Sequence, residues 1–185
     1  MFSTLFNFVL KPSPTINQIM QERKLKLALL GYCVGAFSIV LARALTVGTS
    51  IFGFITSFLF ILFFNVCISF FFSATAHLFL ELTTGRGRAA GLFVLLGLSE
   101  FAKTLFVAFS LIALTFPTLQ GYKGLFVLAV LLLQLFFVLY MMKHAYGLSK
   151  KMTLFALIIS FVPSIICFLA TIFILISAVF LLIFA

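Results

Sequence analysis

The chain has 185 residues and a formal net charge of +9, but only 8% of its residues are charged while 65% are apolar, including 28 phenylalanines. A soluble domain contains about 45–50% apolar and about 25% charged residues, so the composition excludes a soluble domain and predicts an integral membrane protein. The lysines and arginines stand in small groups between long apolar runs and form no basic face, which excludes nucleic acid as the partner.

Residues 1–24 are predicted to form an amphipathic segment at the membrane interface. Two short helices are expected, divided near Pro12, with Ser13 as the N-cap and Pro14 in the first turn of the second helix. Such a helix lies in the plane of the interface, so we expect an anchor that orients the first span, with a docking site for a partner as the alternative. The apolar positions are Phe2, Leu5, Phe6 and Val9, followed by Ile16, Ile19 and Met20.

Residues 25–185 are predicted to form one all-α domain of five transmembrane helices. A bilayer core about 30 Å thick needs about 20 apolar helical residues, and continuously apolar runs indicate helices rather than the alternating strands of a membrane barrel. Pro163 is expected to kink the last span, and a division of that span at Pro163 is the main alternative. The predicted spans are residues 25–45, 51–80, 89–116, 125–142 and 152–184.

The distribution of positive charge predicts how the spans are oriented. Alternate loops lie on opposite sides of the membrane, and lysine and arginine are enriched on the cytoplasmic side. One side has nine such residues and the other has two, Arg43 and Lys123, which places the N-terminus in the cytoplasm and the C-terminus outside. The nine are Lys11, Arg23, Lys24, Lys26, Arg86, Arg88, Lys143, Lys150 and Lys151.

Four polar residues are predicted to share a layer near the middle of the membrane. Glu100 and Lys103 are three residues apart, which puts them on one face of the third span. A rise of 1.5 Å per residue places Glu100 about 16 Å from the membrane boundary near Ala89. Asn65 lies deep in the second span and Gln134 lies near the middle of the fourth. Polar groups inside a membrane are costly and are therefore the first candidates for function.

The favoured interpretation of this layer is structural. Lys103 neutralises Glu100, and the two amides form hydrogen bonds across helices. The functional alternative is a proton-sensitive or ligand-sensitive centre of the kind found in transporters. A third interpretation is a site that binds a partner helix.

His77 and Glu81, four residues apart at the cytoplasmic end of the second span, form another polar pair. Their expected role is polarity at the membrane boundary and hydrogen bonding to the adjacent glycine-rich turn, with metal binding or a proton relay as the alternative. Two ligands do not make a metal site, and the other histidine is His144, so neither a metal nor a cofactor is expected. Unpaired cysteines that pack as small apolar side chains are expected at Cys33, Cys67 and Cys167.

Two basic turns are predicted to contact anionic lipid headgroups at the cytoplasmic surface. The turn of residues 83–88 is too short for a phosphate-binding loop and lacks its GK[ST] ending. Charges that set the topology, without a specific ligand, are the alternative. The residues concerned are Arg86, Arg88, Lys143, Lys150 and Lys151.

No enzyme template fits the sequence. It contains neither HExxH nor GxSxG, and it has no aspartate. Its three acidic residues are too few for a mechanism that uses two carboxylates or a metal-bound phosphate. We therefore expect a protein without enzymatic activity.

The pattern of spans and loops resembles the Yip-domain family, membrane proteins related to the Ypt/Rab-interacting proteins. The similar stretches are residues 8–12 followed by Ile16 and Ile19, the glycine-rich basic turn of residues 81–88, and residues 147–152 running into Ala156. The resemblance implies five helices with a cytoplasmic N-terminus. Residues 98–100, Leu-Ser-Glu, stand where many members have Tyr-Ser followed by Pro. The long cytosolic N-terminal region of the eukaryotic members is missing, so Rab binding is not expected and the chain is more similar to prokaryotic members.

The leading expectation is a non-enzymatic protein that organises lipids or partner membrane proteins, in a prokaryotic cytoplasmic (inner) membrane. Its expected partners are the lipid bilayer, anionic headgroups, and a membrane protein or a second copy of the chain. Close helix packing is expected at Gly31 and Gly35 in the first span and, less regularly, at Gly91 and Gly97 in the third. The alternative is a small transporter or channel subunit that uses the polar layer around Glu100 and Lys103.

Overall fold

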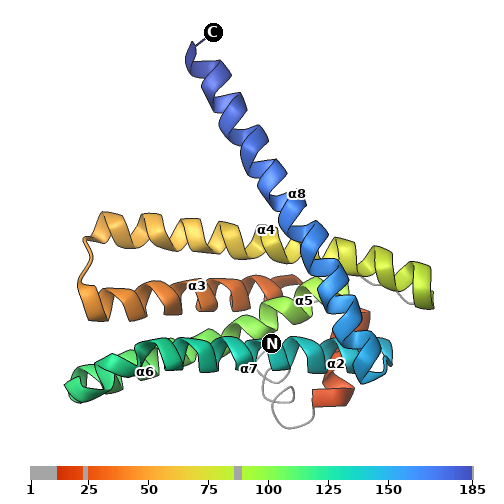
Figure 1. Ribbon diagram of the computed structural model, residues 1–185, viewed down its shortest axis with the longest axis horizontal. Helices are drawn as coiled ribbons and strands as arrows, with labels where there is room; N and C mark the ends of the chain where they lie inside the picture. The colour runs from red at the N-terminus through yellow and green to blue at the C-terminus, as the bar shows by residue number, and fades with distance from the viewer. Residues whose placement is uncertain (1–11, 23–24, 86–88, 185) are drawn as a thin grey trace.

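The computed structural model describes residues 12–22, 25–85 and 89–184. These residues form helices joined by short turns and contain no strand (Figure 1), so the all-α prediction is confirmed. The elements are α2 (Pro12–Glu22), α3 (Leu25–Val47), α4 (Ile51–Thr84), α5 (Ala89–Ser99), the 3₁₀ helix η1 (Glu100–Thr104), α6 (Leu105–Thr115), the 3₁₀ helix η2 (Pro117–Tyr122), α7 (Lys123–Tyr146) and α8 (Lys150–Phe184).

Five helical stretches in the described part of the chain are long and apolar enough to cross a membrane, as predicted. The third stretch contains α5, η1 and α6. Following the predicted orientation, we name the side that holds the start of α3 and the start of α8 the inner side, and the opposite side the outer side. The inner side lies at the right of Figure 1 and the outer side at the left. The stretches are Leu25–Val47, Ile51–Thr84, Ala89–Thr115, Thr118–Tyr146 and Lys150–Phe173.

Glycine ends two of the helices on the inner side. Gly85 follows α4 with φ 64°, and Gly147 follows α7 with φ 63°. Residues other than glycine rarely adopt this positive-φ backbone conformation. It closes the helix with a backbone hydrogen bond to the preceding turn. Helix α7 therefore continues to Tyr146, beyond the predicted end at Met142, because the basic residues of its last turn favour the helix and Gly147 stops it.

Glycine also brings α3 into direct contact with the third span. A Cβ atom on Gly31 would lie 1.9 Å from the carbonyl oxygen of Gly97, and one on Gly97 would lie 2.7 Å from Cα of Ala28. A Cβ atom on Gly35 would lie 2.8 Å from Oε2 of Glu100. None of these distances leaves room for a side chain, so the predicted close approach at Gly31 and Gly35 is confirmed.

Helix α2 packs against α5 and α7. Its apolar residues Ile16, Ile19 and Met20 are buried. Gly91 of α5 leaves space for the Met20 sulfur, which would lie 2.4 Å from a Cβ atom at that position. The apolar stripe of α2 therefore contacts protein instead of pointing into the membrane interface. The first of the two predicted short helices falls in residues 1–11, outside the described residues.

Helix α8 runs through Pro163 without a break, so the alternative of two separate segments is not what the chain forms. Its first half crosses α4, and there Thr75 Oγ1 lies 3.0 Å from the Ser160 carbonyl oxygen and 2.8 Å from Ser164 Oγ. The rings of Phe79 and Phe155 meet nearer the inner side, with centroids 5.8 Å apart. Beyond this crossing, α8 extends away from the other helices (Figure 1).

Candidate functional site

The four residues of the predicted polar layer meet at one carboxylate. Lys103 Nζ donates to Glu100 Oε2 at 2.7 Å, and Asn65 Nδ2 donates to the same oxygen at 2.9 Å. Gln134 Nε2 donates to Oε1 at 2.7 Å. We call Asn65, Glu100, Lys103 and Gln134 the Glu100 cluster. It links α4, η1 and α7, which belong to the second, third and fourth spans.

The backbone of η1 explains the short distance between Glu100 and Lys103. In a 3₁₀ helix, residues three apart are almost eclipsed, whereas in an α-helix they are offset around the axis. The 3₁₀ stretch begins at Glu100 and ends at Thr104, so it coincides with the polar pair. Gly35 of α3 lies against the other side of Glu100, where no side chain would fit. The carboxylate is therefore held between the close-packed α3 and the donors of α4 and α7.

The charges of the Glu100 cluster compensate one another. Glu100 and Lys103 are only 5% and 8% exposed, and together they carry no net charge. Hydrogen bonds to a charged group are stronger than neutral ones, and removing one partner of a buried pair leaves the other charge unpaired at a cost of about 3–5 kcal/mol. The arrangement agrees with the predicted structural role. In addition, Lys103 lines two cavities and Glu100 lines one of them.

The first of these, the inner cavity, has a volume of about 560 Å³ and lies between α4, α5, η1, α7 and α8. Most of its wall is apolar, including Phe72, Leu96 and Phe161. Ligand sites in proteins have this character, with a few polar groups in an apolar cavity of about 300–1,000 Å³. The polar residues that define it are Asn65, Ser69, Glu100, Lys103, Gln134 and Ser164.

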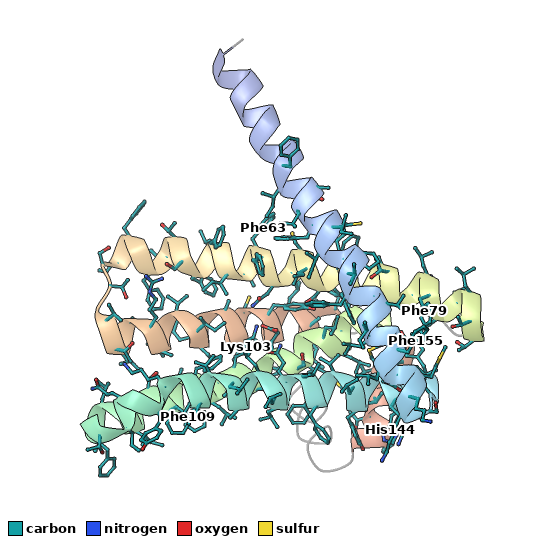
Figure 2. The ribbon with its side chains drawn as sticks, viewed as in Figure 1. Phe63, Phe79, Lys103, Phe109, His144 and Phe155 are labelled. Atoms are coloured by element: carbon teal, nitrogen blue, oxygen red, sulfur yellow. The ribbon has the colours of Figure 1, made fainter. Side chains whose placement is uncertain are left out.

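The second, the outer cavity, has a volume of about 450 Å³ and lies between α3, η1, α6 and α7. Lys103 and Leu131 line both cavities, so the two adjoin at Lys103, whereas Glu100 lines only the inner one. Figure 2 labels Lys103 between α3 and α7 and labels Phe109, another lining residue, farther toward the outer side. The polar residues that define the outer cavity are Arg43, Thr46, Lys103, Ser110 and Lys123.

From the sequence, Arg43 and Lys123 were interpreted only as charges that set the orientation of the spans. The structure places both of them at the outer cavity. A signal was present: each lies at the outer end of its span, and the first and fourth spans carry no other cation on that side. The hydroxyls of Ser69, Ser110 and Ser164 were also missed. Serine is common in membrane helices as a packing residue, so its presence did not single out a site.

The second predicted pair lies apart from the Glu100 cluster. His77 and Glu81 are one turn apart on α4, and His77 Nδ1 is buried with no hydrogen-bond partner among the described residues. His144 lies on α7, where its ring centroid is 4.3 Å from that of Tyr140 (Figure 2). Within the described residues, no three histidine, cysteine or acidic side chains are grouped to hold a metal ion. The unpaired cysteines are Cys33, Cys67 and Cys167.

Three of the five residues predicted to contact lipid headgroups lie on the inner side. Lys143 is in the last turn of α7, and Lys150 and Lys151 begin α8, where both are exposed. Arg86 and Arg88 lie outside the described residues. The structure thus groups the three lysines around the turn at Gly147, in a position compatible with a lipid surface.

The fold and the site together define an all-α integral membrane protein with a buried ion pair whose lysine lines two cavities. Comparison of the chain with protein-family models, with curated proteins and with solved structures gave no match in any of the three. The resemblance to the Yip-domain family therefore stays a prediction from the sequence.

Proposed function

We propose that the chain is a non-enzymatic small transporter or channel subunit, with the Glu100 cluster at the narrow point of its path. The observation that carries this proposal is Lys103, which lines both cavities. A solute that enters from either side reaches the same buried ion pair. Alternating access in transporters uses such a site near the middle of the membrane, reached from one side at a time.

The hydrogen bonds of the Glu100 cluster suggest how the path opens. Asn65 and Gln134 donate from α4 and α7 to the two oxygens of a carboxylate on η1. A polar solute that donates to Glu100 in place of Gln134 releases α7 from η1 while the carboxylate remains satisfied. The Glu100–Lys103 pair then holds a compensated charge throughout, which avoids the cost of an unpaired ion in the membrane.

Flux through liposomes tests this proposal. The purified chain is reconstituted and assayed with protons, potassium, chloride and inorganic phosphate as probes. We expect flux of at least one probe above that of protein-free liposomes, and a loss of about tenfold or more in the folded Glu100→Gln/Lys103→Gln variant, the effect of losing about 1.4 kcal/mol of interaction. Lys150→Gln, a surface lysine outside both cavities, is the control. Absence of flux for all four probes, or full flux in the double variant, would overturn the proposal.

A second candidate is the organising role that the sequence favours, as in a prokaryotic relative of the Yip-domain family at the inner membrane. It is supported by α4, of which little is buried within the described bundle and which exposes Ile55, Phe60 and Phe63. A partner membrane protein or a second copy would cover this face, and the lysines near Gly147 would contact anionic headgroups. Gentle extraction followed by mass spectrometry tests it. A stoichiometric protein partner supports this role, and a retained small molecule or ion without one favours transport.

A further inference from the structure

The outer cavity carries positive charge that the protein does not compensate. Arg43, Lys103 and Lys123 line it, and no acidic residue does. Glu100 neutralises Lys103 but does not itself line this cavity. Neither the Arg43 guanidinium nor the Lys123 ammonium forms an ion pair with a described residue. The cavity therefore has two cations in excess, both exposed at the outer ends of their helices and both without an acidic partner among the described residues.

The polar groups of the outer cavity are also mostly donors. Arginine and lysine side chains donate hydrogen bonds and cannot accept them. The Ser110 hydroxyl has no hydrogen-bond partner among the described residues and is available as a further donor. Thr46 is already engaged, since Oγ1 lies 3.1 Å from the Arg43 carbonyl oxygen. A ligand that matches Arg43, Ser110 and Lys123 must be an anion with several acceptor oxygens.

We propose that the outer cavity binds a phosphate group through Arg43, Lys123 and Ser110. Guanidinium groups match the spacing of phosphate oxygens with paired hydrogen bonds. A phosphate monoester carries a charge of about −1.5 to −2 at neutral pH, which balances the two uncompensated cations, whereas the phosphodiester of a lipid headgroup carries a single negative charge and balances one of them. The cavity is larger than a phosphate group alone, and the stacked rings of Phe109 and Phe126, with centroids 4.3 Å apart, line it beside the cations. There is space for an organic substituent on the phosphate.

Two sources can supply this group: a soluble phosphate and the headgroup of a phospholipid in the outer leaflet. The proposal names a ligand class for the outer end of the proposed path, and it rests on the proposed function only for the passage of a bound ligand toward the Glu100 cluster. Binding is measured at equilibrium and needs no flux, so the two can fail separately. Flux without phosphate binding would contradict the proposed phosphate site and leave the proposed path standing. Phosphate binding without flux would contradict the path and leave the site standing.

The experiment measures inorganic phosphate binding by calorimetry to the full chain in a neutral detergent. In parallel, native mass spectrometry records dioleoyl phosphatidylglycerol retained by the protein. The test variant is Arg43→Gln/Lys123→Gln. The control is Lys26→Gln, which removes a positive charge from an exposed position outside the cavity and outside the basic turns predicted to contact lipid. Ser110→Ala keeps every charge and serves as an independent variant if the double substitution impairs folding.

We expect phosphate affinity to fall about a hundredfold in Arg43→Gln/Lys123→Gln, since each lost charge-assisted hydrogen bond is worth about tenfold. Ser110→Ala should lower it by about fivefold, and the lysine control should leave it unchanged. If the wild type retains phosphatidylglycerol but not free phosphate, and only the cavity variants lose the lipid, the ligand is a lipid headgroup. The proposal is overturned if neither probe binds, or if the cavity and control variants lose binding equally.

Discussion

Glu100 is the residue on which the centre of the molecule depends. Its carboxylate accepts three hydrogen bonds, and the donors come from three different segments of the chain. A carboxylate inside a membrane needs both a counter-charge and partners for its lone pairs. Lys103 supplies the charge, while Asn65 and Gln134 supply the remaining donors. The side chains thus link the second, third and fourth spans at one point.

Removing the negative charge of Glu100 should destabilise the protein through Lys103. In Glu100→Gln the amide can still accept from Asn65 or Gln134, but the buried ammonium of Lys103 loses its counter-charge. We expect the free energy of unfolding to fall by about 3–5 kcal/mol. Thermal or denaturant unfolding in detergent, followed by circular dichroism, measures this change.

The double variant Glu100→Gln/Lys103→Gln separates charge from packing. Because it removes both ions together, we expect it to recover most of the stability that the single variant loses. Lys150→Gln is the surface control and should change the stability by no more than about 0.5 kcal/mol. If the double variant is as unstable as Glu100→Gln, the loss does not come from an unpaired charge, and this account of the cluster is wrong.

Among the elements, the contact between α3 and the third span positions the Glu100 cluster. Gly31 lies against the Gly97 backbone, and Gly35 lies against Glu100 one turn farther along. Helices in membranes associate closely where small residues let their backbones approach. The third span changes from α-helix to 3₁₀ helix at the same level, which aligns Glu100 with Lys103. Close packing and the polar pair therefore depend on each other.

Adding one methyl group at Gly35 should disturb this contact. A Cβ atom there would lie 2.8 Å from Oε2 and 2.9 Å from Cβ of Glu100, so α3 or η1 must move. We expect Gly35→Ala to lower the free energy of unfolding by about 1–3 kcal/mol, the usual cost of overpacking. Gly124→Ala in α7 is the matched control because nothing lies within 4 Å of its added Cβ atom. The control should be neutral or slightly stabilising, and equal losses in the two variants would contradict the packing argument.

Hydropathy predicts the helices well because the bilayer sets both their length and their polarity. Five spans were expected near the positions where the structure has them, and the glycines at 31 and 35 indicated the tight contact. The 3₁₀ stretch at η1 was not predicted, because hydrophobicity does not distinguish its hydrogen bonds from those of an α-helix. The crossing of α8 over α4 was not predicted either, since it depends on Thr75, Ser160 and Ser164 contacts between segments far apart in the sequence.

The described part of the molecule exposes many apolar side chains and contains two cavities that share Lys103. The contacts within the Glu100 cluster could be predicted, because polar side chains at similar depth in a membrane pair with one another inside the bundle. The outer cavity could not, since it depends on which helices are neighbours. Arg43 and Lys123 come from the first and fourth spans, and hydropathy gives no order of helices within a bundle. Only the packed structure places them at one opening.

Cysteine accessibility tests most directly whether two separate cavities adjoin at Lys103. Cys33, Cys67 and Cys167 are replaced by alanine, and one cysteine is then introduced at Ser69, in the inner cavity, or at Ser110, in the outer cavity. A membrane-impermeant thiol reagent is applied to sealed vesicles of each orientation. Retaining Cys167 as the single cysteine provides a control at an exposed position in α8, outside both cavities.

The proposed function has water entering the two cavities from opposite sides of the membrane, so we expect Ser69→Cys to react only from the inner side and Ser110→Cys only from the outer side. The retained Cys167 should react from neither side, since its exposed side chain lies within the fifth apolar stretch and outside both cavities. Reaction of both introduced cysteines from the same side, or of neither from any side, would contradict two cavities that meet at Lys103.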